Sequence, residues 1–502
     1  MSATDATGVA VMMQQALSMH QRGQFNEAEK LYRQVLQDHP QHFDALHLLG
    51  VLARQGGHPQ LALELIGQAL QVDPHQAVAH CNIGVALQDL NQPERALHHY
   101  ERALELNPNY AVALNNRGNT LRKLQRYDEA LRSYEEALRC KPDYAEAYYN
   151  HATVLHKLRR FDEALAGFEQ ALRYKPDYPD AWCNHGLALQ MLQRYEEALA
   201  SYEQALQRAP QHAASWCNRG TVLRKMQRYD EALCCYDLAL QHAPAMADAH
   251  LFRGNTLRAL SRPDEAIASY RHALEHGADP EQVHYALAAL GAEAAPVASP
   301  ADYVKNLFDR YADHFDNHLQ DVLHYRTPEL LVAAVRKFGV GDACDTIDLG
   351  CGTGLCGPLL KPFSRSLVGV DLSPNMLDKA LQREIYDQLA CGDIVEFLQP
   401  KIDCYDLAVA ADVLVYVGDL APVFRMLQGA LRNGSVFAFS VEDHDGDGFV
   451  LRASHRFAHS ADYLTSMASD FGFSIEAMES QVLRYDDGVA INGNLALMTC
   501  RK

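Results

Sequence analysis

A short apolar run that ends in an acid and a glycine-rich bend is the segment of this sequence best suited to hold a ligand. Residues 346–349 (Thr-Ile-Asp-Leu) lead into residues 350–354 (Gly-Cys-Gly-Thr-Gly). A strand that turns through glycines into a helix brings bare backbone close to a ligand at the carboxyl edge of a parallel sheet. Asp371 follows seventeen residues beyond Gly354, after a second apolar run. Its carboxylate can accept hydrogen bonds from both hydroxyls of a ribose.

Three glycines of this segment, Gly352, Gly354 and Gly357, also satisfy the GxGxxG pattern of dinucleotide-binding proteins. Two features argue against a dinucleotide. Asp348 directly precedes the glycines, where its negative charge would repel a pyrophosphate and attract an ammonium group, and the interval to Asp371 is shorter than usual. S-adenosylmethionine combines adenosine with an ammonium and a sulfonium group and has no phosphate, so it is the cofactor that this pattern favours.

From residue 343 onward, short apolar runs alternate with longer helical stretches, which predicts a parallel α/β sheet. Over residues 301–502 the chain resembles class I methyltransferases, on segment 348–354, Asp371, segment 391–394 and segment 405–412. The resemblance implies a Rossmann-like seven-stranded sheet, with Asp393 accepting a hydrogen bond from the adenine amino group. It implies these cofactor-binding residues: Asp348, Gly350, Cys351, Gly352, Gly354, Asp371, Leu372, Met376, Asp393, Ile394 and Ala411.

The segment that precedes the sheet has aromatic residues at helical spacing, Tyr303, Phe308, Tyr311 and Phe315. This face either packs on the sheet or caps the cofactor, with Tyr311 or Phe315 near the sulfonium, because a ring face attracts a cation. Tyr325 and Arg326 are candidates to hold the cofactor's carboxylate, since a guanidinium pairs well with that group.

Methyl transfer requires alignment of donor and acceptor, exclusion of water and, for an alcohol or ammonium acceptor, removal of a proton. Asp412, His444 and His459 are the candidate bases; the alternative for each is simple hydrogen bonding or solvation in a loop. Arg452 and Arg456 are candidates to orient an acidic acceptor.

The first part of the chain is a repeat with a period of 34 residues. Alanine recurs at this interval from Ala28 to Ala266, proline recurs from Pro40 to Pro244, and glycine keeps the same phase in most units. A small residue at the glycine and alanine phases lets two helices approach closely. Each unit has two apolar-periodic stretches, and the proline ends the second because proline cannot continue a helix. The pattern resembles the tetratricopeptide repeat in eight copies over residues 9–280, which implies an α-solenoid. Residues 281–300 are expected to be a linker, and the whole chain is similar to bacterial proteins that join such repeats to a methyltransferase.

Five central units carry asparagine at one phase, Asn82, Asn116, Asn150, Asn184 and Asn218. In the resembled family the first helices line the concave face, so these amides form a ladder along a groove that binds a protein or peptide. An amide offers a donor and an acceptor to a peptide main chain whatever its side chains. The alternative is that the asparagines cap or pack between helices.

Composition sets outer limits on function. The formal charge is −19, from 45 Lys+Arg and 64 Asp+Glu, which argues against a nucleic-acid binder because phosphate affinity rests on excess Lys and Arg. Apolar runs are too short for a membrane helix and the N-terminus lacks a basic region before its apolar stretch, so we expect no membrane association and a cytoplasmic protein. Twelve cysteines without a CxxC pair indicate reduced thiols and no metal site.

Three hypotheses for function follow. The first is a methyltransferase whose repeats recruit a protein or peptide substrate. The second is a small-molecule methyltransferase whose repeats serve assembly, and the third is a scaffold that binds the cofactor without chemistry. The oligomeric state and the acceptor atom stay open.

Overall fold

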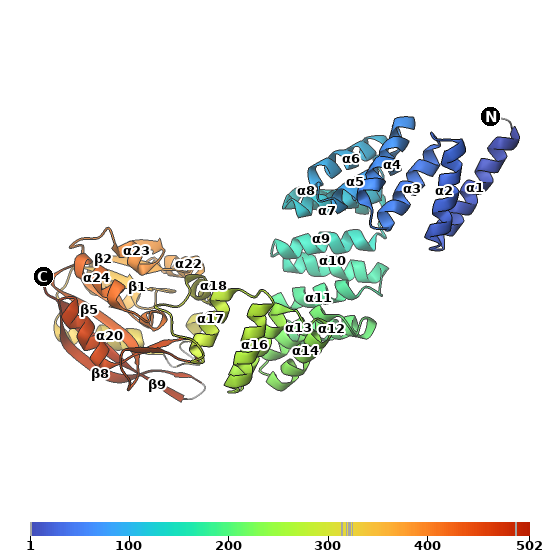
Figure 1. Ribbon diagram of the computed structural model, residues 1–502. Helices are drawn as coiled ribbons and strands as arrows, with labels where there is room; N and C mark the ends of the chain where they lie inside the picture. The colour runs from blue at the N-terminus through green and yellow to red at the C-terminus, as the bar shows by residue number, and fades with distance from the viewer. Residues whose placement is uncertain (1–2, 313–314, 318, 320–322, 324, 487–488) are drawn as a thin grey trace. The chain divides into compact units, whose positions relative to one another are not determined.

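The structure is a computed structural model that describes residues 3–312, 315–317, 319, 323, 325–486 and 489–502 (Figure 1). It divides into two compact units, Met1–Pro244 and Ala245–Lys502. The first unit is built from paired helices. The second contains three further helices of this kind and an α/β domain. In the described ranges, every helix is too short or too polar to span a lipid bilayer.

The helices of the first unit form successive antiparallel pairs. Their bounds are α1 (Ala3–Gln21), α2 (Phe25–Asp38), α3 (Phe43–Gln55), α4 (Pro59–Val72), α5 (Ala77–Asp89), α6 (Pro93–Leu106), α7 (Ala111–Lys123), α8 (Tyr127–Cys140), α9 (Ala145–Lys157), α10 (Phe161–Tyr174), α11 (Pro179–Met191), α12 (Tyr195–Arg208), α13 (Ala213–Lys225) and α14 (Tyr229–His242). Consecutive first helices also contact one another, α3 with α5, α5 with α7, α7 with α9, α9 with α11 and α11 with α13.

The glycine phase has a steric reason. A Cβ on Gly186 of α11 would lie 2.6 Å from a ring carbon of Tyr202 on α12, and a Cβ on Gly118 of α7 would lie 2.5 Å from Tyr134. Both tyrosines are fully buried. The missing side chain therefore makes room for the aromatic ring of the paired helix, as the small-residue phase predicted.

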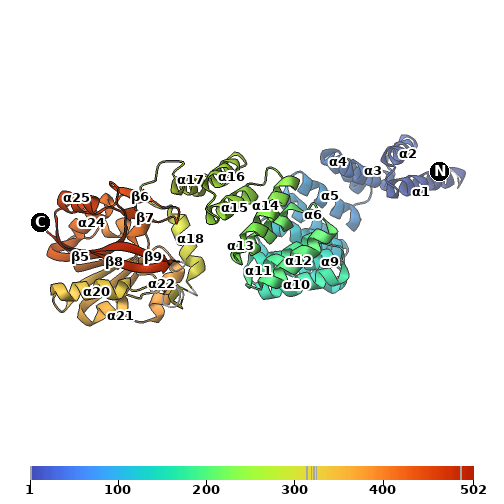
Figure 2. The ribbon, with the colours of Figure 1, turned by 90° about the horizontal axis from the view of Figure 1, so that it is seen from below.

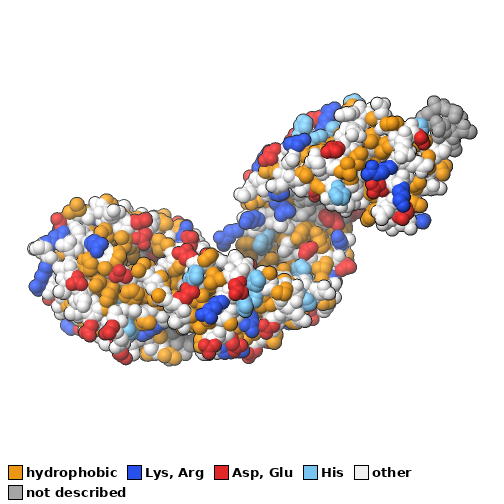
Figure 3. Space-filling model, in the orientation of Figure 1, with side chains coloured by type: hydrophobic (Ala, Val, Ile, Leu, Met, Phe, Trp, Pro, Cys, Tyr) orange, Lys and Arg blue, Asp and Glu red, His pale blue; other side chains and the backbone are white. Residues whose placement is uncertain are grey.

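The outer surface of the repeats carries regularly spaced ion pairs. Arg126–Glu129, Arg160–Glu163 and Arg194–Glu197 recur at the start of the second helices, with N–O separations of 2.6–2.7 Å. Figure 3 shows basic and acidic side chains interspersed over the repeats. Exposed pairs of this kind contribute little to stability, because water and salt screen the attraction between their charges.

The second unit begins with α15 (Ala247–Ala259), α16 (Pro263–Glu275) and α17 (Pro280–Ala289). The segment expected to be a linker is ordered: α17 covers its first half, and Ala298 forms an antiparallel bridge with Val417. The Gly418 N–H donates to the Val297 carbonyl at 2.9 Å, and the Ser299 N–H donates to the Tyr416 carbonyl at 2.9 Å. Residues 297–299 are therefore part of the α/β domain.

The α/β domain contains a sheet in the order β3-β2-β1-β4-β5-β7-β6, with β9 antiparallel to β5 and β8 antiparallel to β9. The strands are β1 (Cys344–Leu349), β2 (Ser364–Asp371), β3 (Gln388–Cys391), β4 (Tyr405–Ala410), β5 (Leu431–Asp443), β6 (Phe449–Leu451), β7 (Phe457–His459), β8 (Phe473–Asp486) and β9 (Val489–Cys500). The helices are α18 (Ala301–Tyr311), α19 (Phe315–Asn317), α20 (Thr327–Phe338), α21 (Gly357–Leu360), α22 (Pro374–Gln382), α23 (Ile394–Leu398), α24 (Ala421–Ala430) and α25 (Ala461–Asp470), with 3-10 turns η2 (Lys361–Phe363) and η3 (Leu414–Tyr416).

Helices cover both faces of this sheet, as Figure 2 shows for α24 and α25 on one face and α20 and α21 on the other. Phe424, Phe437 and Phe439 centre the core on the α24 face, and Leu331, Leu360 and Leu407 centre the core on the α20 face. Among the described residues the sheet has nine strands rather than the seven expected. The additional strands are the short hairpin β6–β7, which extends the sheet beyond β5.

Candidate active site

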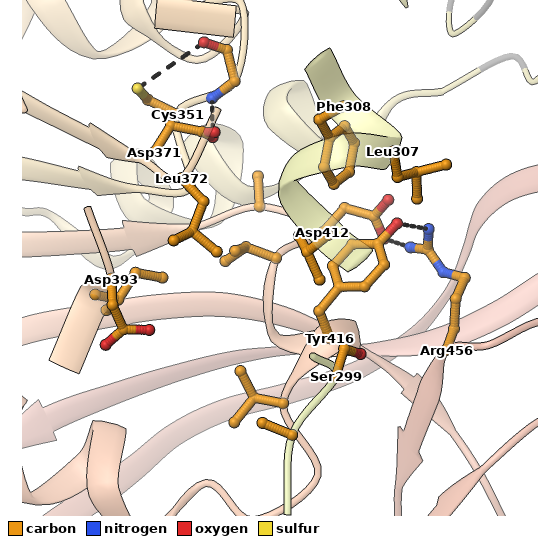
Figure 4. Close-up of a pocket in the computed structure, with 18 of the residues that line it drawn as sticks. Ser299, Leu307, Phe308, Cys351, Asp371, Leu372, Asp393, Asp412, Tyr416 and Arg456 are labelled. Carbon is orange, nitrogen blue, oxygen red and sulfur yellow. Dashed lines mark hydrogen bonds and ion pairs between the residues drawn. The ribbon is translucent and has the colours of Figure 1, made fainter. Parts of the chain in front are cut away.

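A cavity of about 390 Å³ lies at the carboxyl ends of β1, β2 and β4 (Figure 4). A parallel sheet exposes backbone and side chains for ligand binding at this edge. Figure 4 shows Asp371, Leu372 and Asp393 on one side of the cavity and Asp412, Tyr416 and Arg456 on the other. These predicted cofactor residues are in its lining: Tyr311, Tyr325, Gly350, Cys351, Gly352, Asp371, Leu372, Asp393, Ile394 and Ala411.

The bend after β1 has backbone that favours glycine. Gly350 has φ 66° and Gly352 has φ 54°, both in the left-handed region. A Cβ on Gly350 would lie 2.4 Å from Val413, whereas a Cβ on Gly352 would meet nothing closer than Phe315 at 3.9 Å. Gly350 thus packs against the segment after β4, and Gly352 leaves its backbone open toward the cavity.

Two acids anchor the neighbouring loops. Asp371 accepts hydrogen bonds from the Gly352 N–H at 2.9 Å and the Ser373 N–H at 2.8 Å. Burial raises the pKa of Asp371, and these two backbone donors act in the opposite direction. Asp393 caps α23 and accepts from the Val395 N–H at 2.8 Å. These hydrogen bonds hold both side chains in place at the edge of the cavity.

The structure places Asp348 in a buried position next to the glycine bend. Its side chain is 1 % exposed, lies outside the cavity lining and accepts a hydrogen bond from the Tyr386 hydroxyl at 2.6 Å. Burial raises the pKa of Asp348 to about 7.

Three further residues of the predicted cofactor set are also placed outside the described lining. Arg326 is exposed at the start of α20. Met376 is fully buried in α22. A Cβ added to Gly354 would lie 3.0 Å from the Tyr386 ring, so this glycine lets the bend pack closely against Tyr386.

Helix α18 and the short α19 contribute aromatic side chains to the wall of the cavity. Phe308, Tyr311 and Phe315 line it, and the Phe308 ring lies edge-on to both Phe315 and Tyr416, with centroids 5.8 and 5.5 Å apart. The Ser373 hydroxyl donates to Asp309 at 2.6 Å, which ties α18 to the loop after β2. Tyr303 departs from this face, because its hydroxyl pairs with His455.

Asp316 of α19 fastens this part of the wall to the glycine bend. It accepts from the Thr353 hydroxyl and from the Arg383 guanidinium, each at 2.5 Å. Arg383 also donates to the Thr353 carbonyl at 2.7 Å. The residues 313–314, 318, 320–322 and 324 of this region lie outside those that the structure describes.

The opposite end of the cavity has a network of buried charges. Arg456 donates to Asp412 at 2.5 Å and to Glu442 at 2.8 Å, and Arg484 donates to the same two carboxylates at 3.3 and 2.5 Å. Arg452 reaches Glu442 at 3.0 Å. Burial lowers the pKa of Arg456, but the neighbouring carboxylates outweigh this and raise it, so the guanidinium stays charged.

The structure places the three candidate bases differently. Asp412 lines the cavity and forms ion pairs with Arg456 and Arg484. His459 is 0 % exposed and hydrogen-bonds the Gly418 carbonyl at 3.0 Å, and burial lowers its pKa to about 4. His444 accepts from the Gly446 N–H at 2.9 Å in its own loop. Neither histidine is in the described lining.

Sequence reasoning missed Tyr386, Asp316, Arg383 and Arg484. Arg484 is on β8, far along the chain from the glycine bend, and no local motif surrounds it. Tyr386 follows α22 in an irregular segment. Alternation of side chains along a strand is the signal that normally identifies inward-facing residues. It fails for Arg484, because Leu483 and Arg484 are both buried at a bulge in β8, which breaks the alternation.

The asparagine ladder lies entirely in the first unit and bonds from repeat to repeat. Each amide nitrogen contacts the side chain 35 residues earlier: Asn150 donates to Asn115 at 3.0 Å, and Asn184 donates to the Tyr149 hydroxyl at 3.0 Å. Asn82 pairs with His47, and Asn116 and Asn218 donate to Cys81 and Cys183. All five side chains are half-buried. The alternative that the asparagines pack between helices therefore accounts for the amide nitrogens.

Comparison with known proteins identifies both parts of the chain. Residues 347–437 match the model of a methyltransferase domain, and residues 77–110, 149–213 and 217–283 match models of the tetratricopeptide repeat. The chain therefore combines tetratricopeptide repeats with a methyltransferase domain. A solved structure described as YrrB, a TPR protein with an unusual peptide-binding site, is 28% identical, covers 37% of this chain and 96% of its own, with a TM-score of 0.33.

Curated relatives match parts of the methyltransferase domain. An 18S rRNA (guanine-N(7))-methyltransferase of Bos taurus is 35% identical over 74 residues, which is 15% of this chain and 26% of that protein. A probable S-adenosylmethionine-dependent methyltransferase, CRG1, of Saccharomyces cerevisiae is 27% identical over 120 residues (22% and 40%). A malonyl-[acyl-carrier protein] O-methyltransferase of Serratia marcescens is 31% identical over 94 residues (19% and 36%).

The matches thus span two fifths or less of these relatives' own length. Because they include rRNA methyltransferases, the exclusion of nucleic acid that we inferred from net charge is not supported.

Proposed function

We propose that this chain is an S-adenosylmethionine-dependent methyltransferase of the class I type, whose repeats recruit a protein or peptide substrate. The observation that carries the proposal is the hydrogen bond from the Gly352 N–H to Asp371. Both residues line one cavity together with Asp393. Gly350 and Gly352 would accommodate the methionyl part, Asp371 the ribose and Asp393 the adenine. Bound there, the cofactor supplies an electrophilic methyl group on a positively charged sulfur.

The residues of the cavity suit this cofactor chemically. Carboxylates at the ends of β2 and β3 offer acceptors to hydroxyl and amino groups, and Leu372 and Ile394 offer apolar surface to an adenine. Aromatic rings of Phe308, Tyr311 and Phe315 cover the opening, where they can contact a sulfonium and exclude water. All twelve cysteines are free thiols, which agrees with a cytoplasmic location.

The repeats are proposed to bind an extended peptide through the oxygen side of the asparagine ladder. The amide nitrogens are engaged between repeats, which orients each carbonyl oxygen in a fixed direction as an acceptor for a peptide N–H. Contacts between consecutive first helices support their position on the inner side of a curved array. A small-molecule methyltransferase and a cofactor-binding scaffold are the alternatives.

One experiment separates these three functions. Protein is incubated with methyl-tritiated S-adenosylmethionine and a cell extract, and the label is followed into protein, small molecules or neither. We expect labelled protein with the wild-type chain, a loss of at least about tenfold with Asp371→Ala because ribose hydrogen bonds are removed, and a similar loss with Asn150→Ala plus Asn184→Ala.

The matched control for the ladder is Gln170→Ala plus Gln204→Ala, which removes two amides at the same spacing from the second helices α10 and α12. This control should label like the wild type. Label that appears in an extractable small product would favour the second hypothesis. Saturable cofactor binding, measured by calorimetry, without any product would favour the scaffold.

A further inference from the structure

Two guanidinium groups wall the end of the cavity where the methyl group would be transferred. Arg456, between β6 and β7, and Arg484 of β8 both line the cavity together with Tyr416. Their side chains are 15 % and 5 % exposed. Figure 4 places Arg456 beside Asp412 and Tyr416, across the cavity from Asp393. An acceptor that approaches the methyl group from this end meets these groups first.

This end of the cavity offers guanidinium N–H groups to a ligand. Glu442 pairs with both arginines, but its side chain is 2 % exposed and lies outside the lining. At this end the lining contributes Arg456, Arg484 and the carboxylate of Asp412, and its other acids are Asp371, Asp393 and Asp419. Bonds to Asp412, Glu442 and Tyr416 use three of the five N–H groups of Arg456.

Apolar side chains surround these arginines. Val304, Leu307 and Phe308 of α18 line the cavity next to Tyr416 and Val417. A ligand that fits must therefore carry an anionic head on an apolar stem, since the polar groups of a fully polar ligand would lose water against α18 without gaining hydrogen bonds.

The acids of the lining are already engaged by the protein. Asp371, Asp393, Asp412 and Asp419 each accept two hydrogen bonds from described residues, so part of their capacity to accept a proton from an acceptor is in use. An acceptor that arrives already ionised and nucleophilic requires no proton transfer at all.

From these observations, and resting on the proposed methyltransferase function, we infer that the methyl acceptor is a carboxylate on an apolar stem, held by Arg456 and Arg484. One carboxylate oxygen attacks the methyl carbon in line with the sulfur. The new C–O bond forms as the C–S bond breaks, and the bonding pair stays on the sulfur, which becomes neutral. The products are a methyl ester and S-adenosylhomocysteine, and no proton moves.

The chemistry of the labelled product tests this inference. Methyl esters release methanol in mild alkali, whereas N-, S- and C-methyl groups do not. We expect product labelled by the full chain from methyl-tritiated cofactor to release its tritium as volatile methanol. Label retained after alkali would overturn the carboxylate acceptor and leave the methyltransferase proposal standing. No labelled product despite cofactor binding would overturn both.

Binding gives a readout that is independent of turnover. The full chain, saturated with S-adenosylhomocysteine, is titrated by calorimetry with 3-phenylpropionate and with its neutral amide. We expect the carboxylate to bind at least about tenfold more tightly, because charge-assisted hydrogen bonds to guanidinium are the stronger kind. Equal affinity of the two probes would overturn the inference.

Variants assign the preference to the arginines. Arg456→Gln should abolish the difference between the two probes, whereas Arg432→Gln should leave it unchanged. Arg432 is a matched control because it also pairs with two carboxylates, Asp345 and Asp406, but on the opposite edge of the sheet. A retained preference in Arg456→Gln would contradict the assignment. If that variant fails to fold, the comparison of the probes on the wild-type chain decides the question.

Discussion

Asp348 and Asp371 are carboxylates near the ends of neighbouring parallel strands, yet they face different surroundings. Asp371 is the last residue of β2 and turns into the cavity, where it holds the Gly352 N–H. Asp348 precedes the end of β1 by one residue, so the alternation of side chains directs it beneath the bend, onto Tyr386. A shift of one position thus separates an acid that lines the cavity from one that is buried beside it.

The raised pKa of Asp348 makes a pH-dependent prediction. In the unfolded chain this acid ionises near pH 4, but in the fold burial raises its pKa to about 7. Its contribution is therefore most favourable below about pH 4 and is lost as pH rises toward 7. Asp348→Asn keeps an acceptor for Tyr386 and removes the ionisation.

We expect Asp348→Asn to be more stable than the wild type at pH 8, by on the order of 3 kcal/mol, and to show little advantage at pH 4. Thermal unfolding at several pH values measures this difference. A constant difference across that range would show that Asp348 ionises normally in the fold.

Single residues also mark how far sequence reasoning reaches. Gly350, Gly352, Asp371 and Asp393 could be predicted because they occupy local motifs, and the structure brings them to one cavity. Arg484 could not, because its place at the site depends on how β8 pairs with β9 and β9 with β5. Long-range strand pairing leaves no short motif in the chain.

In most repeats, the two helices of a pair pack closely because a glycine of the first helix lies against a tyrosine ring of the second. The period of 34 residues predicted the pairs, and the proline and glycine phases predicted their ends and close approach. Gly67, in contrast, lies in the interior of α4, where an added Cβ would meet nothing within 4 Å. The two positions let the same substitution be compared in opposite surroundings.

Gly186→Ala and Gly67→Ala should therefore shift stability in opposite directions. The first places a methyl group 2.6 Å from the Tyr202 ring and should destabilise the repeats by about 1–3 kcal/mol. The second removes backbone entropy from an open helix position and should stabilise by about 0.5–1 kcal/mol. Urea unfolding followed by helical circular dichroism measures both. A gain in Gly186→Ala would refute the steric account.

At the scale of the whole chain, the second unit begins before the methyltransferase domain, at Ala245. The Tyr285 hydroxyl of α17 donates to the His455 carbonyl at 2.7 Å, next to Arg456, and Arg258 of α15 donates to the Ala453 carbonyl. Composition suggested a linker at residues 281–300, because small residues and prolines are typical of one. Bridge pairing to Val417 and the buried Tyr285 could not be foreseen from composition.

Two shortened chains would test this boundary. A chain of residues 245–502 keeps α17 and the pocket-lining residues 297–299, whereas a chain of residues 301–502 loses both. We expect the longer one to bind S-adenosylmethionine within about threefold of the full chain, because its contacts to His455 and Val417 are intact. The shorter one exposes the cavity wall and should unfold at a lower temperature and bind at least about tenfold more weakly. Calorimetry and thermal unfolding give both quantities, and equal behaviour of the two shortened chains would contradict a structural role for α17 and residues 297–299.

Because the longer chain lacks the asparagine ladder, it should also fail to label a protein substrate while it still binds the cofactor. This result would separate recruitment from catalysis in a single comparison.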